Sequence, residues 1–316
     1  MVGRNSSGVE GILSLGNYAL TIFFGWALYR YAIGSELRLR ILLDAYVKFF
    51  YIVTIFSLLS LFFLLAFGEL DLFGFKQPTK QHLVTPFGVH FKRVFGPITV
   101  YRSFFYFSEA VHLGGFYAAN IIIVAPLLKA KAKAFKQINV LGGLVSLSVT
   151  FYVVLFVLYA VKKTKSIYSL IAILISAYAL IFLIQVVDAA SYVSGADRTD
   201  RFLMFFLAMS QADNMQWLLG HGVASKRAFE SLVRPGFMLA FNSGFTLSIY
   251  EIGLIGTALQ MLILFVFKPH FIIFVFFLLT AAVVDPIHYP LFWYFFIIIS
   301  LALNGESINS KSQYRN

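Results

Sequence analysis

The chain has 316 residues, of which 60% are hydrophobic, 18% are aromatic and only 12% are charged, and its mean hydropathy is +0.83. Ordinary globular domains carry roughly 25% charged residues, so this composition excludes a soluble globular protein. The net charge is +11, and no basic–aromatic motif of the nucleic-acid-binding kind accompanies it. The charge is therefore typical of lysines and arginines that hold membrane loops against anionic lipid. Because there is no cysteine, disulfides and Cys-ligated metal sites are excluded.

Eight apolar runs approach the length that a helix needs to cross a bilayer, about 20 residues. They predict an all-α protein, a polytopic transmembrane helical bundle that forms a single integral membrane domain over residues 1–316. The first run is too long and too aromatic for the apolar region of a signal peptide, so we expect it to be retained as a span. The predicted segments are 12–33, 46–67, 112–128, 138–161, 167–187, 244–267, 271–284 and 287–303.

Basic clusters in the short connections set the predicted orientation, because cytoplasmic loops carry an excess of Lys and Arg. Residues 36–40, 129–136 and 162–165 form such clusters, and we place them on the cytoplasmic side. The two long connections, 68–111 and 188–243, then lie on the extracytoplasmic side. We expect short interfacial helices in these segments, because 202–211 is apolar but too short to cross the membrane.

The run 138–161 conflicts with this orientation, because it has basic clusters at both ends but is only about one span long. It contains the sequence LGGLVSLS at 141–148. One interpretation is a broken or re-entrant segment that turns at these glycines and serines, which is tolerated where irregular backbone is buried in protein. The alternative is a plain span that violates the charge rule.

Arginines in the long connections are the first candidates for a binding site. A guanidinium group binds phosphate or carboxylate through two parallel hydrogen bonds, so several of them at one membrane face would suit a lipid-linked diphosphate. The alternative is that they bind lipid phosphates at the interface or pair with nearby aspartates. The candidate diphosphate ligands are Arg93, Arg198, Arg201 and Arg234.

His221 and Glu109 are the candidate catalytic bases. His221 lies between two glycines, which allow a sharp turn, and a neutral imidazole can accept a proton near neutral pH. The alternative is a loop histidine that is held by a backbone carbonyl. Glu109 lies where a polar loop enters the third span, where a carboxylate is costly unless it is paired or functional; helix capping is the competing explanation. Asp213 is a weaker candidate base.

No His/Asp/Glu spacing of the metal-binding kind and no Walker A lysine appear in the sequence, so we expect neither a metal nor another cofactor.

Two stretches, WLLGHGVAS at 217–225 and FNSGFTLSIYEIGLIGTALQMLILFVF at 241–267, resemble the carboxyl half of the O-antigen polymerase and O-antigen ligase superfamily. The similar parts are a Gly-x-Gly loop, an asparagine at a helix start, and a Glu-x-Gly-Leu-x-Gly motif. Upstream, the region from Arg93 to Glu109 is similar to the family's entry to a span, and the resemblance covers roughly 91–256. Phe241 stands where ligases typically keep a histidine, which favours a polymerase. The loop and asparagine positions, with a substrate-binding or structural role, are Gly220, Gly222 and Asn242.

The resemblance implies a metal-independent glycosyltransferase of the bacterial inner membrane, with a polyprenyl-diphosphate-linked oligosaccharide as donor and a second lipid-linked repeat unit as acceptor. It implies that arginines stabilise the leaving diphosphate and that Glu109 or His221 takes the acceptor proton. A chain-length regulator and a repeat-unit flippase are the implied protein partners, and membrane lipid surrounds the chain. The alternatives are a ligase that transfers glycan to lipid A core and a transporter or flippase for lipid-linked sugar.

Overall fold

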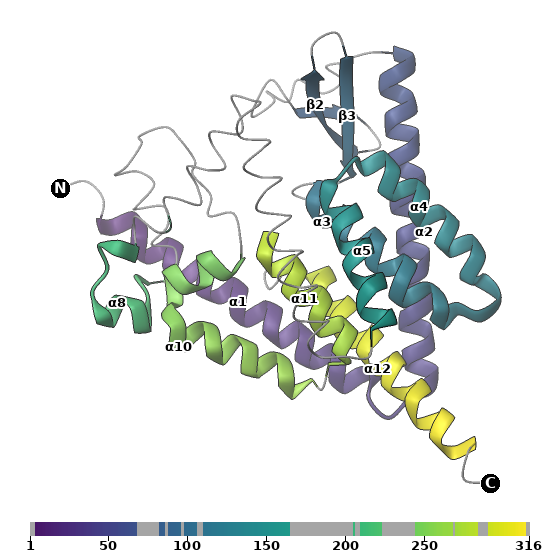
Figure 1. Ribbon diagram of the computed structural model, residues 1–316. Coiled ribbons are helices and arrows are strands. Elements are labelled where there is room, and N and C mark those ends of the chain that lie inside the picture. The colour runs from purple at the N-terminus through teal and green to yellow at the C-terminus, as the bar shows by residue number, and fades with distance from the viewer. Residues whose placement is uncertain are drawn as a thin grey trace. The chain divides into compact units, whose positions relative to one another are not determined.

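The computed structural model describes residues 4–67, 82–85, 88–95, 98–105, 110–164, 205, 209–222, 244–267, 269–283 and 290–313 (Figure 1). Their contacts divide the chain into two compact units. We call residues 1–39 with 178–316 the terminal unit, and residues 40–177 the central unit. The sequence did not predict this division, and a single membrane domain stays a prediction.

Apolar helices dominate the described residues, as the composition predicts. Three helical runs are long and apolar enough to cross a membrane, namely Glu36–Phe67, Leu113–Ser146 and Thr246–Val266. Two shorter apolar helices, Phe271–Ala281 and Leu291–Gly305, accompany them. The helical membrane class is therefore supported, whereas the number of about eight spans stays a prediction.

The terminal unit is built from helices at both ends of the chain (Figure 1). Helix α1 packs against α12, and α10 packs against both α8 and α11. The ring of Phe267 contacts that of Trp293 edge-on at a centroid distance of 5.6 Å. Helix α1 can approach α12 closely because residue 25 is a glycine. A Cβ atom at this position would meet the Trp293 ring. The helices are α1 (Arg4–Ala32), α8 (Asn214–Leu219), α10 (Gly244–Val266), α11 (Phe271–Val283) and α12 (Pro290–Gln313). They cover four of the predicted segments, 12–33, 244–267, 271–284 and 287–303; 167–187 lies outside the described residues.

The central unit contains most of α2 (Glu36–Phe67), a small sheet and a run of helices that pack on α3 (Ala110–Ala119). Helix α3 continues as a π-helix, Asn120–Val124, and then as a 3₁₀ helix, Ala125–Lys131. The backbone leaves helical geometry at Lys129, where φ is 47° and ψ is −109°. The chain then turns back, so that α4 (Ala132–Ser146) packs against α3.

A three-stranded antiparallel sheet lies in the first long connection, where we expected only interfacial helices. Strands β1 (His82–Thr85), β2 (Gly88–Phe95) and β3 (Ile98–Phe105) pair in the order β1-β2-β3. The all-α prediction did not contain this sheet. The missed signal was alternation of apolar and polar residues on either side of Gly96-Pro97, a turn-favouring pair.

The run 138–161 is broken, as one of the two interpretations predicts. Helix α4 ends at Leu147, which adopts a left-handed conformation with φ 44°, and Ser148 is extended before α5 (Val149–Lys163) begins. Both helices pack against α3 (Figure 1). Lysines from the start of α4 and from the end of α5 line the same cavity, so the chain reverses and forms a helical hairpin. A plain continuous span is therefore wrong for this segment.

A buried chain of polar side chains fixes α2, the π-helix and α4 to one another. The Tyr46 hydroxyl donates to Asn120 Oδ1 at 2.8 Å, and Asn120 Nδ2 donates to Asn139 Oδ1 at 2.7 Å. Asn139 in turn donates to the carbonyl of Phe135 at 2.7 Å. Asn120 and Asn139 are completely buried. Because a buried polar group without a partner is costly, these contacts specify how the three elements meet.

We expect Asn120→Leu to destabilise the protein by roughly 1–3 kcal/mol, because it removes the acceptor of the Tyr46 hydroxyl and the donor to Asn139 Oδ1. Denaturant titration of the purified protein in detergent micelles measures the change. Tyr152→Phe is the matched control, since Tyr152 is exposed and its hydroxyl loss should cost less than about 0.5 kcal/mol. Equal stability of the Asn120 variant and the wild type would contradict a structural role for the polar chain.

Candidate functional site

Helix α8 is a short helix with a well-formed start. The Asp213 carboxylate accepts the N–H of Gln216 at 2.7 Å, and the Gln216 side chain accepts the N–H of Asp213 at 3.0 Å. This reciprocal pair is a capping box, which satisfies N–H groups that the first turn leaves without partners. Asp213 was a weaker candidate base; its position shows a capping role instead.

The loop after α8, Gly220 to Gly222, lies against an interruption of helix α10. At Gly253 the backbone leaves helical geometry with φ 69° and ψ −177°. In a continuous helix the carbonyls of Tyr250 and Glu251 would accept N–H groups four residues ahead, beyond this break. Instead they accept the N–H of His221 at 2.8 Å and the N–H of Gly222 at 2.9 Å. Two successive donors of the loop thus satisfy two successive acceptors of the broken helix.

Glycine is required on both sides of this crossing. Gly220 has φ 78° and Gly253 has φ 69°, a conformation that side chains with a Cβ rarely adopt. A Cβ on Gly220 would overlap the backbone of Glu251, and one on Gly253 would overlap the backbone of Leu218. Gly222 also has a positive φ, 98°, but a Cβ there would meet open space. The two segments are therefore in backbone-to-backbone contact at Gly220 and Gly253.

His221 is held against α10 by its ring as well as by its backbone. The imidazole stacks on the Tyr250 ring with a centroid distance of 4.3 Å and an interplanar angle of 13°. Its Nδ1 lies 3.2 Å from the Tyr250 carbonyl oxygen. A carbonyl can only accept, so a hydrogen bond here places the proton on Nδ1 and leaves Nε2 as the basic nitrogen of the neutral ring. The contact between Nδ1 and the Tyr250 carbonyl agrees with the alternative interpretation of His221 as a loop histidine that a backbone carbonyl holds. The same contact also orients the imidazole ring.

Glu251 is the residue of this site to which the sequence analysis gave no role. It is the single charged residue between Gly244 and Val266 and is only 5% exposed. A buried carboxylate in an apolar, membrane-length helix is a functional-site signal. Next to it, Tyr250 forms a buried apolar cluster with Phe205 and Met209, which belong to the second long connection. Phe205 and Met209 therefore pack on α10 beside the interruption.

The structure brings together only part of the predicted site. His221, Gly220 and Gly222 lie together at the α8–α10 crossing. The backbone of Arg93 lies in β2 of the central unit, paired with Val100, and nothing is described of its side chain. The other predicted site residues lie outside the described residues, namely Glu109, Arg198, Arg201, Arg234 and Asn242. Within the described residues, no group of three or more His, Asp and Glu side chains could hold a metal ion.

We expect Gly220→Ala and Gly253→Ala to disrupt the crossing, whereas Gly222→Ala should be tolerated better. All three variants carry the strain of a positive φ, about 1–2 kcal/mol. Only the first two add backbone overlap, which should cost about 1–3 kcal/mol more. Thermal unfolding in detergent, followed through the fluorescence of Trp217 in α8, measures the difference. Equal loss of stability in all three variants would show that the close backbone contact is unimportant.

Comparisons with known proteins leave the family open. No protein-family model matches the sequence, no curated protein matches it, and no solved structure matches the fold. The interpretation of the site therefore depends on its own geometry and on the motifs of the chain.

Proposed function

We propose that the protein is a membrane glycosyltransferase that polymerises polyprenyl-diphosphate-linked oligosaccharide repeat units into a surface polysaccharide, on the periplasmic face of the bacterial inner membrane. The observation that carries the proposal is the α8–α10 crossing. The two motifs on which the resemblance depends, Gly-His-Gly and Glu-x-Gly, lie about 30 positions apart in the sequence and are hydrogen-bonded to each other through main-chain atoms. One motif contains a buried carboxylate, that of Glu251 in α10, and the other contains an oriented imidazole, that of His221 in the loop after α8.

The proposed reaction requires a donor sugar, an acceptor hydroxyl, a base and ligands for the leaving diphosphate. The acceptor hydroxyl oxygen forms a bond to the anomeric carbon of the donor sugar, while the bond from that carbon to the diphosphate oxygen breaks. The hydroxyl proton passes to a base, for which His221 Nε2 or Glu109 is our candidate. The polyprenyl diphosphate leaves, and Arg93, Arg198, Arg201 and Arg234 are the proposed ligands that stabilise its growing negative charge. The sugar–diphosphate bond already carries the energy, so no nucleotide enters the scheme.

His221 can be tested as the base with an alanine variant, because alanine keeps the backbone N–H that bonds to the Tyr250 carbonyl at the crossing. We expect His221→Ala to lower polymer formation about 100-fold or more, while the protein still accumulates in the membrane. The assay is gel analysis of surface polysaccharide in a deletion strain that carries each variant. Asp213→Asn is the control, because asparagine caps a helix as well as aspartate does and the ladder should stay unchanged. A normal ladder from His221→Ala would exclude His221 as base.

The arginine proposal has its own test. Arg198→Ala, Arg201→Ala or Arg234→Ala should each abolish long polymer and leave the single-repeat product, because loss of one charge-stabilising donor costs about 100-fold or more in rate. The same gel measures the outcome. Full-length chains from all three variants would refute the diphosphate-binding role. Loss of all glycan from the lipid A core, with polymer still formed, would identify a ligase.

A second candidate function is transport of a lipid-linked sugar, and the interruption of α10 at Gly253 favours it. Transporters build midplane binding sites from interrupted helices of this kind. The purified protein in detergent micelles, supplied with polyprenyl-diphosphate-linked repeat units, distinguishes the two. A glycosyltransferase forms new glycosidic bonds without any membrane to cross, whereas a transporter leaves the repeat units unchanged.

A further inference from the structure

A cavity with one apolar and one basic side lies in the central unit, at the open end of the α4–α5 hairpin. Its volume is about 580 Å³, which is within the usual range of small-molecule sites. The apolar wall comes from the π-helix and the 3₁₀ helix, through Ile121, Ile122, Ala125 and Pro126. The basic side is formed by Lys133 and Lys136 at the start of α4 and by Lys162 and Lys163 at the end of α5.

Two of the lysines contact the walls of the cavity. Lys162 Nζ donates to the carbonyl of Ile122, in the π-helix, at 3.2 Å. The ammonium of Lys163 lies 5.9 Å from the centroid of the Tyr159 ring, which also lines the cavity. These contacts place both ammonium groups at the edge of the cavity.

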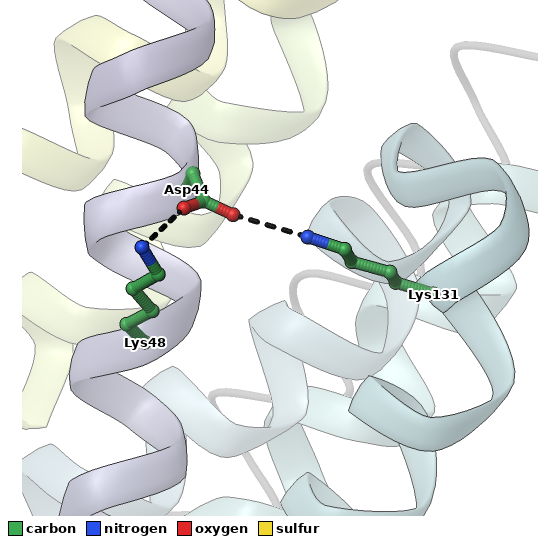
Figure 2. A network of polar contacts seen from close by, with 3 residues as sticks. All are labelled: Asp44, Lys48 and Lys131. Carbon is green, nitrogen blue, oxygen red and sulfur yellow. Dashed lines mark hydrogen bonds and ion pairs between the residues drawn. The ribbon is translucent and has the colours of Figure 1, made fainter.

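No acidic side chain that the structure describes neutralises this cluster. From residue 110 to residue 187 the sequence contains seven lysines and no aspartate or glutamate. Among the described residues of the central unit the one carboxylate is that of Asp44, which pairs with Lys48 at 2.8 Å and Lys131 at 3.2 Å (Figure 2). Lys131 does not line the cavity, and no described carboxylate pairs with the four lysines that do. The cavity therefore combines an apolar wall with positive charge that no described carboxylate compensates.

We propose that this cavity binds the phosphate headgroup of an anionic phospholipid, with the lysines around the phosphate and the apolar wall against the acyl chains. The apolar wall favours a lipid over free phosphate, because a soluble anion gains nothing from it. Each helix of the hairpin has 15 residues and is about 22 Å long, short of the roughly 30 Å hydrocarbon core. A re-entrant hairpin has both basic ends on one side of the membrane, where such headgroups lie. The proposal is independent of the glycosyltransferase function.

The test uses the full-length protein reconstituted in phosphatidylcholine bilayers with spin-labelled phosphatidylglycerol, whose motionally restricted fraction measures binding. We expect selective binding of phosphatidylglycerol over spin-labelled phosphatidylcholine. Lys133→Gln/Lys136→Gln and Lys162→Gln/Lys163→Gln should each weaken that selectivity, by about fivefold for every lysine removed. Lys129→Gln/Lys131→Gln is the matched control, because it removes the same charge from the same basic region but outside the cavity.

Two results would overturn the proposal. Equal weakening by the control pair would show that net charge of the region, not the cavity, attracts the lipid. Displacement of the labelled phosphatidylglycerol by inorganic phosphate at equal concentration would show a free-phosphate site instead of a lipid site. Polysaccharide formation by the same variants is measured separately, so failure of this proposal and failure of the glycosyltransferase proposal are distinguishable.

Discussion

Where two of the described helices depart from regular geometry, their backbone carbonyls find hydrogen-bond donors inside the protein, because an unsatisfied buried polar group is costly. The interruption of α10 leaves two carbonyls, which the loop after α8 satisfies with two main-chain N–H groups. The carbonyl of Gly253 itself accepts the hydroxyl of Thr257 at 2.8 Å. In the central unit the Ile122 carbonyl, in the π-helix that interrupts regular α-helical geometry, accepts a hydrogen bond from Lys162 Nζ. Both the α8–α10 crossing and the lysine-lined cavity therefore lie where a helix departs from regular geometry.

The need to satisfy backbone hydrogen bonds also explains which helices could be predicted from the sequence. Hydropathy predicts helices because an apolar run in lipid must satisfy its own backbone, and the run 244–267 matches α10, Gly244–Val266, almost to the residue. Lysine clusters at both ends of 138–161 made a break one of two interpretations, because both ends favour the same side of the membrane. The structure adds the position of the turn, Leu147 and Ser148, a few residues after the two glycines. The two glycines do not form the turn but allow aromatic rings to pack closely against α4. Cβ atoms on Gly142 and Gly143 would meet the rings of Tyr117 and Phe151, respectively.

The sheet and the site were harder to predict. The strands of 82–105 are short, and their alternation lies inside a segment whose arginines and aromatics suggested an interface, so the strand signal was overlooked. The contact of His221 with Tyr250 could not be derived, because it joins residues 29 positions apart through main-chain atoms that carry no sequence signal. Gly253 did stand in a quoted motif, but a glycine in a helical pattern does not by itself reveal a break. Glu251 is a lone charge in an apolar run, and the sequence alone therefore marks it as a candidate functional residue.

The close contact of Gly220 with Gly253 has a mechanical consequence. Two segments that touch backbone to backbone, with two hydrogen bonds next to the contact, have no side chains between them that could repack into a second arrangement. If the two segments slid or separated at this contact, two N–H groups and two carbonyls would lose their hydrogen bonds together. Any conformational cycle of this protein should therefore carry α8 and the middle of α10 as one rigid body, with its hinges elsewhere in the chain.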